Sequence, residues 1–460
     1  MVFPVVGGTQ DTGYEIENSL RFNEDDSAYL NKTFGSEGSK RTMTFSFWIK
    51  RGEFGDERYF LYSAGADANN RDAIATMDES LDIIFQRNDT TYYRLRTNRL
   101  FRDPSAWYHI VVAIDTTDGT SSNRIKLYVN GVQESSFATS DYPTQNLDLY
   151  FNDDIAQTIG RYSQSDSNHW DGHIADFYFI DGTQYAASDF GKTDDNGVWI
   201  PKKFTGTFGS NGYFLEFQQT GTSANASGKG ADTSGNDNHW DDNGMTAEDI
   251  TTDTPTNNFA TWNPLYKASN VTLSNGNCKA AIAGSGQSRS VMSTIAVASG
   301  KWYWEIKYTT DVEAGFVSAI TTDFNVYGSS LSNNGSSDNV GYISGGNKYI
   351  NGSASSYGNG WDDGDIVGVA LNIDDDEVVF YKNGTAQNSG TAISKTFSGF
   401  YYASAQHTSS SGTSNFEVNF GNPTFSISSG NADGNGYGNF EYAPPSGFYA
   451  LCTKNLAEYG

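Results

Sequence analysis

Cysteine is nearly absent from this sequence. Only Cys278 and Cys452 occur among 460 residues, both of them in the second half of the chain. Two cysteines are too few for a disulfide framework in a chain of this size, so we expect buried free thiols rather than a bridge. This scarcity agrees with synthesis in a cytoplasm.

Basic residues and long apolar runs are also scarce. The chain has 29 Lys and Arg against 55 Asp and Glu, which gives a formal net charge of −26. No basic cluster could follow a phosphate backbone, so we expect neither nucleic acid nor a membrane as a partner. No window approaches the roughly 20 apolar residues of a membrane span. The N-terminus "MVFPVVGGTQDTGYEIENS" lacks the basic and apolar regions of a secretory signal.

The sequence does contain a repeated hairpin pattern on a background rich in Gly, Asn, Ser, Thr and aromatic residues. The stretch "RIKLYVNGVQ" at 124–133 has a close counterpart in "EVVFYKNGTA" at 377–386. In both, an alternating apolar run leads to Asn-Gly, the pair that best tolerates the positive φ angles of a type I′ turn. The composition and the two hairpins predict an all-β protein with two β domains in series.

Strand-like segments group on either side of a loop-rich stretch. We expect an N-terminal arm at 1–18, a first sandwich at 19–218, a Gly/Asn/Thr-rich linker at 219–268 and a second sandwich at 269–460. The linker has almost no periodic apolar signal. Because it contains Trp240, Phe259 and Trp262, we expect it to pack on the domains rather than extend into solvent.

The two halves resemble known folds. The segments "MTFSFWIKRG", "WYHIVVAID", "RIKLYVNGVQ" and "DGHIADFYFIDGT" resemble a laminin-G/concanavalin-A-like jelly roll, whereas "GKWYWEIKY", "VGVALNID", "EVVFYKNG" and "NFEVNFG" resemble a SPRY domain. The resemblance implies two concanavalin-like antiparallel jelly-roll sandwiches in tandem. This domain order, with the phrases "ADTSGNDNHWDDNG", "TPTNNFATWNP" and "FPVVGGTQDTGYEIENSLRFN", is similar to virion proteins of tailed phages that infect marine bacteria.

The sequence offers no catalytic pattern. Endoglucanases with this type of fold need two Glu flanking an Asp on one strand face, because retaining hydrolysis requires two neighbouring carboxyl groups, and no such spacing occurs. Glu305 stands alone, and the acidic run 374–377 belongs to a hairpin turn. The five His are scattered, which disfavours a zinc site. We expect no enzymatic activity; the alternatives are a carbohydrate-active hydrolase and a bacterial surface adhesin.

Aromatic residues in or beside polar loops are the candidates for a glycan site, because sugar faces stack on exposed rings. These candidates are Tyr92, Tyr93, Trp170, Trp240, Tyr357 and Trp361. The competing interpretation is ordinary packing of each ring within its loop.

The resemblance also implies a calcium hypothesis, because laminin-G-like domains often hold Ca²⁺ through loop Asp and carbonyl oxygens. The candidate ligands are Asp67, Asp72, Asp232 and Asp237. The competing interpretation is a set of solvated turns in which Asp and Asn bond to nearby backbone. We expect no other cofactor.

The resemblance to tailed-phage virion proteins, together with the missing catalytic pattern, implies a non-enzymatic structural protein on the surface of a phage virion, made in the host cytoplasm. It would be a capsid-decorating knob or fibre, or a tail appendage, that adheres to host surface polysaccharide. The expected partners are other virion proteins, in a homo-oligomer or multi-copy assembly. The apolar segment "VFPVVGG" lies outside the first sandwich, so it is a candidate for docking on a neighbouring subunit, with packing on its own domain as the alternative. The docking candidates are Val2, Phe3, Val5 and Val6.

Overall fold

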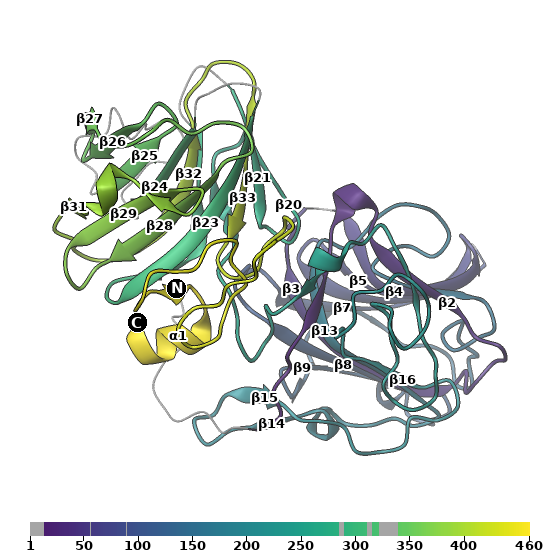
Figure 1. Cartoon of the computed structure of the whole chain (residues 1–460). Helices are drawn as coiled ribbons and strands as arrows, with labels where there is room; N and C mark the ends of the chain where they lie inside the picture. Colours follow the sequence, from purple (N-terminus) through teal and green to yellow (C-terminus); the bar gives the residue numbers. More distant parts are fainter. Residues whose placement is uncertain (1–12, 56, 89, 285–288, 311–314, 322–338) are drawn as a thin grey trace. The chain divides into compact units, whose positions relative to one another are not determined.

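The computed structural model describes residues 13–55, 57–88, 90–284, 289–310, 315–321 and 339–460 (Figure 1). The described chain divides into two compact units, the first ending at Thr256 and the second beginning at Asn257. Both units consist of β-sheets, antiparallel except for one short strand pair in the second unit, that pack as sandwiches. The predicted all-β fold with two sandwiches in tandem is therefore confirmed.

Two large sheets form the first unit. One has the order β10 (Val132–Gln133), β9 (Ile125–Val129), β8 (Tyr108–Asp115), β3 (Thr42–Arg51), β13 (Gly172–Asp181), β1 (Ser19–Phe22) and β18 (Ile250–Thr251), with β16 (Tyr213–Leu215) also paired to β13. The other has the order β11 (Phe137–Asp141), β7 (Thr91–Leu100), β6 (Ser80–Arg87), β5 (Asn70–Met77), β4 (Arg58–Asp67), β12 (Ala156–Ile159), β2 (Tyr29–Thr33) and β17 (Asp241–Asn243). A separate hairpin consists of β14 (Gly191–Thr193) and β15 (Trp199–Pro201).

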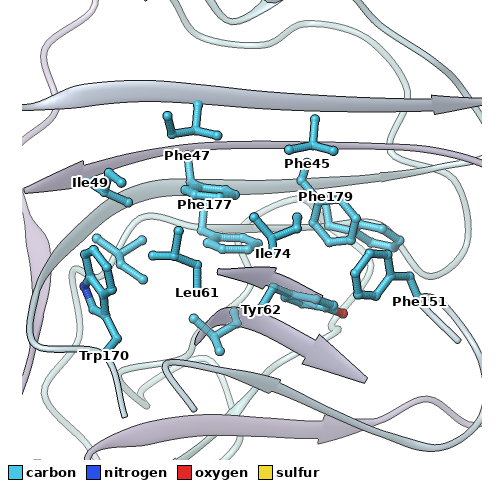
Figure 2. Packing of buried hydrophobic residues seen from close by; sticks show 14 of the residues in the cluster. Phe45, Phe47, Ile49, Leu61, Tyr62, Ile74, Phe151, Trp170, Phe177 and Phe179 are labelled. Atoms are coloured by element: carbon cyan, nitrogen blue, oxygen red, sulfur yellow. The ribbon is translucent and has the colours of Figure 1, made fainter. Parts of the chain in front are cut away.

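The core of the first unit lies between these sheets. Alternate residues of β3 point into it, as the period of two along this strand predicts. Figure 2 shows the rings of Phe45 and Phe47 from β3 close to Phe177 and to Tyr62 of the opposite sheet. Phe47 stacks on Phe177 with ring centroids 4.8 Å apart, and Phe45 lies 4.7 Å from Tyr62. Aromatic rings from both sheets therefore fill the sandwich.

Two further sheets form the second unit. One has the order β19 (Trp262–Lys267), β22 (Arg289–Val297), β32 (Tyr401–His407), β24 (Gly315–Ile320), β25 (Asn339–Ile343), β26 (Asn347–Ile350) and β27 (Ser353–Ser356). The other has the order β20 (Val271–Ser274), β21 (Lys279–Ala283), β33 (Thr413–Asn419), β23 (Lys301–Thr310), β28 (Ile366–Asn372), β29 (Glu377–Lys382) and β30 (Thr385–Ala386). Two short strands extend this second sheet: β31 (Ile393–Ser394) pairs with β29, and β34 (Tyr449–Ala450) pairs in parallel with β23.

The core of the second unit follows the same logic. Trp302, Trp304, Ile306 and Tyr308 alternate along β23 and are all buried in it. The chain ends in a short helix, α1 (Thr453–Tyr459). Among the described residues, no helix has the length and apolarity needed to cross a membrane. Both cysteines are buried and free, as the sequence predicts.

The two Asn-Gly pairs form the predicted type I′ turns. Asn130 and Gly131 have φ angles of 47° and 78°, and Asn383 and Gly384 have 47° and 74°. Each pair closes a two-residue hairpin, between β9 and β10 in the first unit and between β29 and β30 in the second. The prediction that both stretches are β-hairpins is confirmed.

The equivalence of the hairpins extends to their hydrogen bonds. The Asn130 backbone N–H donates to the carbonyl of His109, and the Asn130 Oδ1 accepts from the N–H of His109. Asn383 makes the same two bonds with Ile366. His109 lies near the start of β8 and Ile366 begins β28, so each Asn ties its turn to the strand that precedes the hairpin. The repeated motif is thus one structural device used in both sandwiches.

The segment expected to be a linker contributes strands to both units. Strand β17 pairs with β2, β18 pairs with β1, and β19 pairs with β22. Trp240, Phe259 and Trp262 are buried, so these three rings of the segment pack inside the two units. Residues 219–256 therefore belong to the first sandwich and residues 257–268 to the second. Of the expected N-terminal arm, Ile16 packs against Trp48 and Trp107 of the first unit.

Candidate functional site

Most of the aromatic residues proposed for glycan binding lie in the cores. Trp170, Trp240, Tyr357 and Trp361 are at most 6% exposed. Trp170 and Trp240 belong to the core of the first unit, and Tyr357 and Trp361 to that of the second. The expectation that these four rings offer a stacking surface was therefore wrong.

These rings face inward although their sequence surroundings are polar. The Trp361 ring meets Tyr308 edge to face at 4.8 Å, and the Tyr357 hydroxyl accepts a hydrogen bond from the backbone N–H of Phe380. A polar loop closes the end of a sandwich, and its aromatic side chains can turn inward to fill that end. Polar neighbours in sequence therefore do not reveal the direction of the ring.

Tyr92 and Tyr93 lie on strand β7 and point to opposite faces of it. Tyr93 packs against the core of the first unit, and its hydroxyl donates to Thr144 at 3.3 Å. Tyr92 lies on the outer face and is 38% exposed. Of the aromatic candidates, Tyr92 has the ring that is open to solvent.

The four calcium candidates make contacts with donors or ion-pair partners within the first unit. Asp72 is buried and forms an ion pair with Arg87 at 2.6 Å, so its charge is already compensated. The Asp67 carboxylate accepts hydrogen bonds from Asn69 and Asn70 within its own turn. These contacts fit the turn interpretation rather than a cation.

The Asp232 carboxylate is also occupied by donors. It accepts from the backbone N–H groups of Phe214, Ser234 and Asn238. Asp237 is exposed and lies 3.7 Å from the ring of His239. In the part of the chain that the structure describes, no group of three or more His, Cys, Asp or Glu is arranged to hold a metal. The docking candidates Val2, Phe3, Val5 and Val6 lie outside the described residues.

A polar pocket of about 230 Å³ occurs in the first unit. It is lined by Tyr14, Glu15, Glu17, Asp176, Lys203, Glu216 and Gln218. Asp176 is buried, and its backbone has a φ of 46° within a β-bulge of β13. Burial raises the pKa of Asp176 to about 8, although a hydrogen bond from Tyr14 opposes that shift. A strained, buried acid in a pocket is a typical mark of a functional site.

A buried Ser–His pair in the first unit lacks the geometry of a nucleophile and its base. His109 Nε2 lies 2.9 Å from the hydroxyl of Ser46, while the indole N–H of Trp199 donates to His109 Nδ1 at 3.0 Å. Because Nδ1 accepts that bond, the ring proton of the neutral imidazole lies on Nε2 and points at Ser46. Burial lowers the pKa of His109 to about 3. This imidazole therefore cannot accept a proton from Ser46.

Glu305 has a structural role in the second unit. Its carboxylate accepts from the Tyr303 hydroxyl, from Asn419 Nδ2 and from the backbone N–H groups of Glu441 and Tyr442. Burial raises its pKa to about 7, against the effect of these hydrogen bonds. The side chain is fully buried and secures the segment around residue 441 to strand β23.

Two family matches agree with these folds. Residues 22–188 match the Concanavalin A-like lectin/glucanases superfamily, and residues 301–422 match the SPRY domain. The chain carries a concanavalin A-like domain followed by a SPRY domain. The first unit is called the concanavalin A-like domain below, and the second the SPRY domain. No curated protein matches the chain.

Several solved structures are similar to this chain. The SPRY domain of human HERC1 matches at 17% identity with a TM-score of 0.29, covering 34% of this chain and 96% of that one. The TRIM65 PSpry domain matches at 14% identity with a TM-score of 0.29, over 34% and 88% of the two chains. The stonustoxin structure matches at 14% identity with a TM-score of 0.29, over 56% of this chain and 35% of that one.

The pocket of the concanavalin A-like domain was not found by sequence reasoning. Asp176 and Glu216 are far apart in sequence and meet because β13 pairs with β16. One signal was available in the strand "GHIADFYFID". Its core residues Ile174, Phe177 and Phe179 are spaced by three and then by two, and a break in the period of two indicates a bulge.

Proposed function

We propose that the protein is a non-enzymatic component of the surface of a phage virion. It serves as a capsid-decorating knob or fibre, or as a tail appendage. The observation that carries this proposal is the order of the two domains together with the phrases around Trp240 and Phe259, which are similar to tailed-phage virion proteins. Both residues are buried, so these phrases belong to the folded architecture and are more than spacer sequence.

We further propose that the concanavalin A-like domain adheres to host surface polysaccharide. The outer face of β7 supports this role, because it presents the ring of Tyr92 to solvent. Gln86 lies directly opposite Tyr92 on β6, and Arg94 lies two residues along the same strand face. An open ring beside polar groups is suited to stacking and hydrogen bonding with a sugar.

The virion location predicts that the protein is found on assembled particles. Antibodies raised against the purified chain, followed by immunogold microscopy, should label the capsid or the tail of particles produced from the genome that encodes it. Mass spectrometry of the same purified particles should detect the chain in many copies. Pre-immune serum provides the control. Particles that carry neither label nor chain would contradict the virion role.

A second candidate function is hydrolysis of a glycosidic bond, which the pocket around Asp176 favours. An acid with a raised pKa beside a second carboxyl group, here Glu216, is an arrangement that glycoside hydrolases use. The pocket volume of about 230 Å³ is below the roughly 300 Å³ at which ligand pockets usually begin. The pocket is therefore small for a sugar substrate.

The non-enzymatic proposal predicts that the purified full chain releases no reducing ends from bacterial surface polysaccharides. The variants Asp176→Asn and Glu216→Gln should give the same background rate as the unmodified protein, because neither residue acts on a substrate. A reducing-end assay with a known glycoside hydrolase as positive control tests this. Steady release that is abolished by Asp176→Asn would establish the hydrolase instead.

A further inference from the structure

The outer face of strands β4 to β7 in the concanavalin A-like domain concentrates arginine. The inward residues of these strands, such as Leu61, Ile83 and Leu95, belong to the core, so the alternating positions face outward. The outward side chains include Arg58, Arg71, Arg94 and Arg96. In a chain with a formal net charge of −26, this grouping of positive charge requires a physical explanation.

Two of these arginines are held rigidly by one buried carboxylate. Asp82 is fully buried on β6, and its two oxygens accept bonds from Arg94 Nε at 2.6 Å and Arg94 Nη2 at 2.9 Å. Arg58 Nη2 and Nε donate to the same carboxylate at 3.1 and 3.3 Å. The Arg58–Asp82–Arg94 clamp therefore contains two positive charges and one negative charge.

The clamp retains unused hydrogen-bond donors. Both guanidinium groups contact Asp82 through Nε and Nη2, and both Nη2 atoms also approach the Met77 sulfur, at 3.2 and 3.3 Å. Among the described residues, Nη1 of Arg58 and Nη1 of Arg94 make no hydrogen bond. The two side chains are 21% and 20% exposed. Each guanidinium group thus has its Nε–Nη2 edge bonded to Asp82, and its Nη1 atom can still donate hydrogen bonds to a ligand.

Two guanidinium groups held side by side, as in Arg58 and Arg94, can bind an anionic group. Guanidinium groups bind carboxylates through two parallel bonds, and the resulting charge-assisted hydrogen bonds are stronger than neutral ones. Binding normally costs conformational entropy for each long side chain that it immobilises. Here Asp82 already orders both arginine side chains, so binding of a carboxylate would cost little further side-chain entropy.

Neighbouring residues extend the surface beyond the clamp. Arg71 lies over the ring of Tyr162 at 4.8 Å and donates to its hydroxyl at 2.5 Å. Within the described chain, Arg71 forms no ion pair. Gln86 on β6 lies directly opposite Arg71 of β5 on one side and Tyr92 of β7 on the other. An exposed ring and a row of donors therefore lie on the same face as the clamp.

We propose that this face binds a polysaccharide bearing carboxylate groups, with Arg58 and Arg94 holding a carboxylate and Tyr92 stacking on a sugar ring. The proposal rests on the proposed adhesion to host polysaccharide and names its chemical class. A duplex nucleic acid is less suited to this face, because it needs a line of cations that follows successive phosphates, whereas the described residues of the face form a single clamp.

Affinity electrophoresis of the full chain tests the proposal with polygalacturonate, dextran sulfate, neutral dextran and duplex DNA as probes. We expect retardation by polygalacturonate and none by neutral dextran. The variants Arg58→Gln and Arg94→Gln should each weaken binding about 10- to 100-fold, which corresponds to the loss of a hydrogen bond to a charged group. Tyr92→Ala should also weaken it, and this variant removes only an exposed side chain.

Arg41→Gln is the matched control, because Arg41 is 44% exposed and pairs with Asp148 outside these strands. It should leave the retardation unchanged. Binding that is equal in the clamp variants and the unmodified chain, or that occurs only with dextran sulfate or DNA, would overturn the proposal. If the arginine variants fold poorly, the retardation of Tyr92→Ala by polygalacturonate decides: weaker retardation supports the proposal and unchanged retardation overturns it. Immunogold labelling is independent of this result, so failure of the virion role is distinguishable from failure of carboxylate binding.

Discussion

Replacing Lys50 with methionine is expected to lower the free energy of unfolding of the concanavalin A-like domain by about 3–5 kcal/mol. Lys50 on β3 forms an ion pair with Asp253 at 2.7 Å, and the two side chains are only 2% and 0% exposed. Trp107 also donates to the Asp253 carboxylate at 3.2 Å. Removing the ammonium takes the positive charge of Lys50 away from a fully buried carboxylate, which is far more costly than losing an exposed pair.

Urea unfolding monitored by hydrogen-exchange mass spectrometry measures this effect, because peptides from residues 13–256 are separated from those of the SPRY domain. Lys126→Met on β9, a half-exposed position, is the matched control and should change stability by less than about 0.5 kcal/mol. The double variant Lys50→Met/Asp253→Leu should recover much of the loss, since both charges are then absent. A loss below 1 kcal/mol in Lys50→Met would show that water reaches the pair.

The stability of the same domain should decrease as pH rises from about 4 to 8, and Asp171 is one cause. Its side chain is buried, and Oδ1 accepts no hydrogen bond. Burial first, and then repulsion from Glu53 and Glu24, raise the pKa of Asp171 from its ordinary 3.8 to about 8. In this interval the folded state keeps a proton that the unfolded chain has released, so the free energy of unfolding decreases by up to about 1.4 kcal/mol per pH unit.

The variant Asp171→Asn should flatten this dependence, because an amide has no proton to lose. It should unfold at higher urea concentration than the unmodified chain at pH 8, with little difference at pH 4. Asp154→Asn, at an exposed position, provides the control and should leave the pH profile unchanged. Parallel profiles for Asp171→Asn and the unmodified chain would show that Asp171 is ionised in the folded state at neutral pH.

Much of the fold could be predicted because its signals are local. The Asn-Gly pairs need only two residues to determine a type I′ turn, and both hairpins occur where they were expected. The alternation in β3 is likewise a property of one strand. Packing of the loop-rich segment on the domains followed from its large aromatic residues Phe259 and Trp262, since such rings in a long loop are costly to expose.

The Arg58–Asp82–Arg94 clamp could not be predicted in the same way because it depends on strand register. Arg58, Asp82 and Arg94 lie on three different strands, and only the pairing of β4 to β7 brings them together. One clue was local: Asp82 interrupts the apolar run "SLDIIF", and a carboxylate within such a strand needs a partner. For Trp170 and Trp361, the direction of the ring was the missing information.

Strands β17 and β18 lie at the ends of the two sheets of the concanavalin A-like domain. Without them, β2 and β1 would present unpaired backbone groups, which are templates for pairing with another chain. A polypeptide cut at residue 218 would therefore lack the strands that cover both edges, and it would lack Asp253, which forms an ion pair with Lys50. The segment between residues 219 and 256 thus occupies both sheet edges, so a second copy of the chain cannot add a strand at β1 or β2.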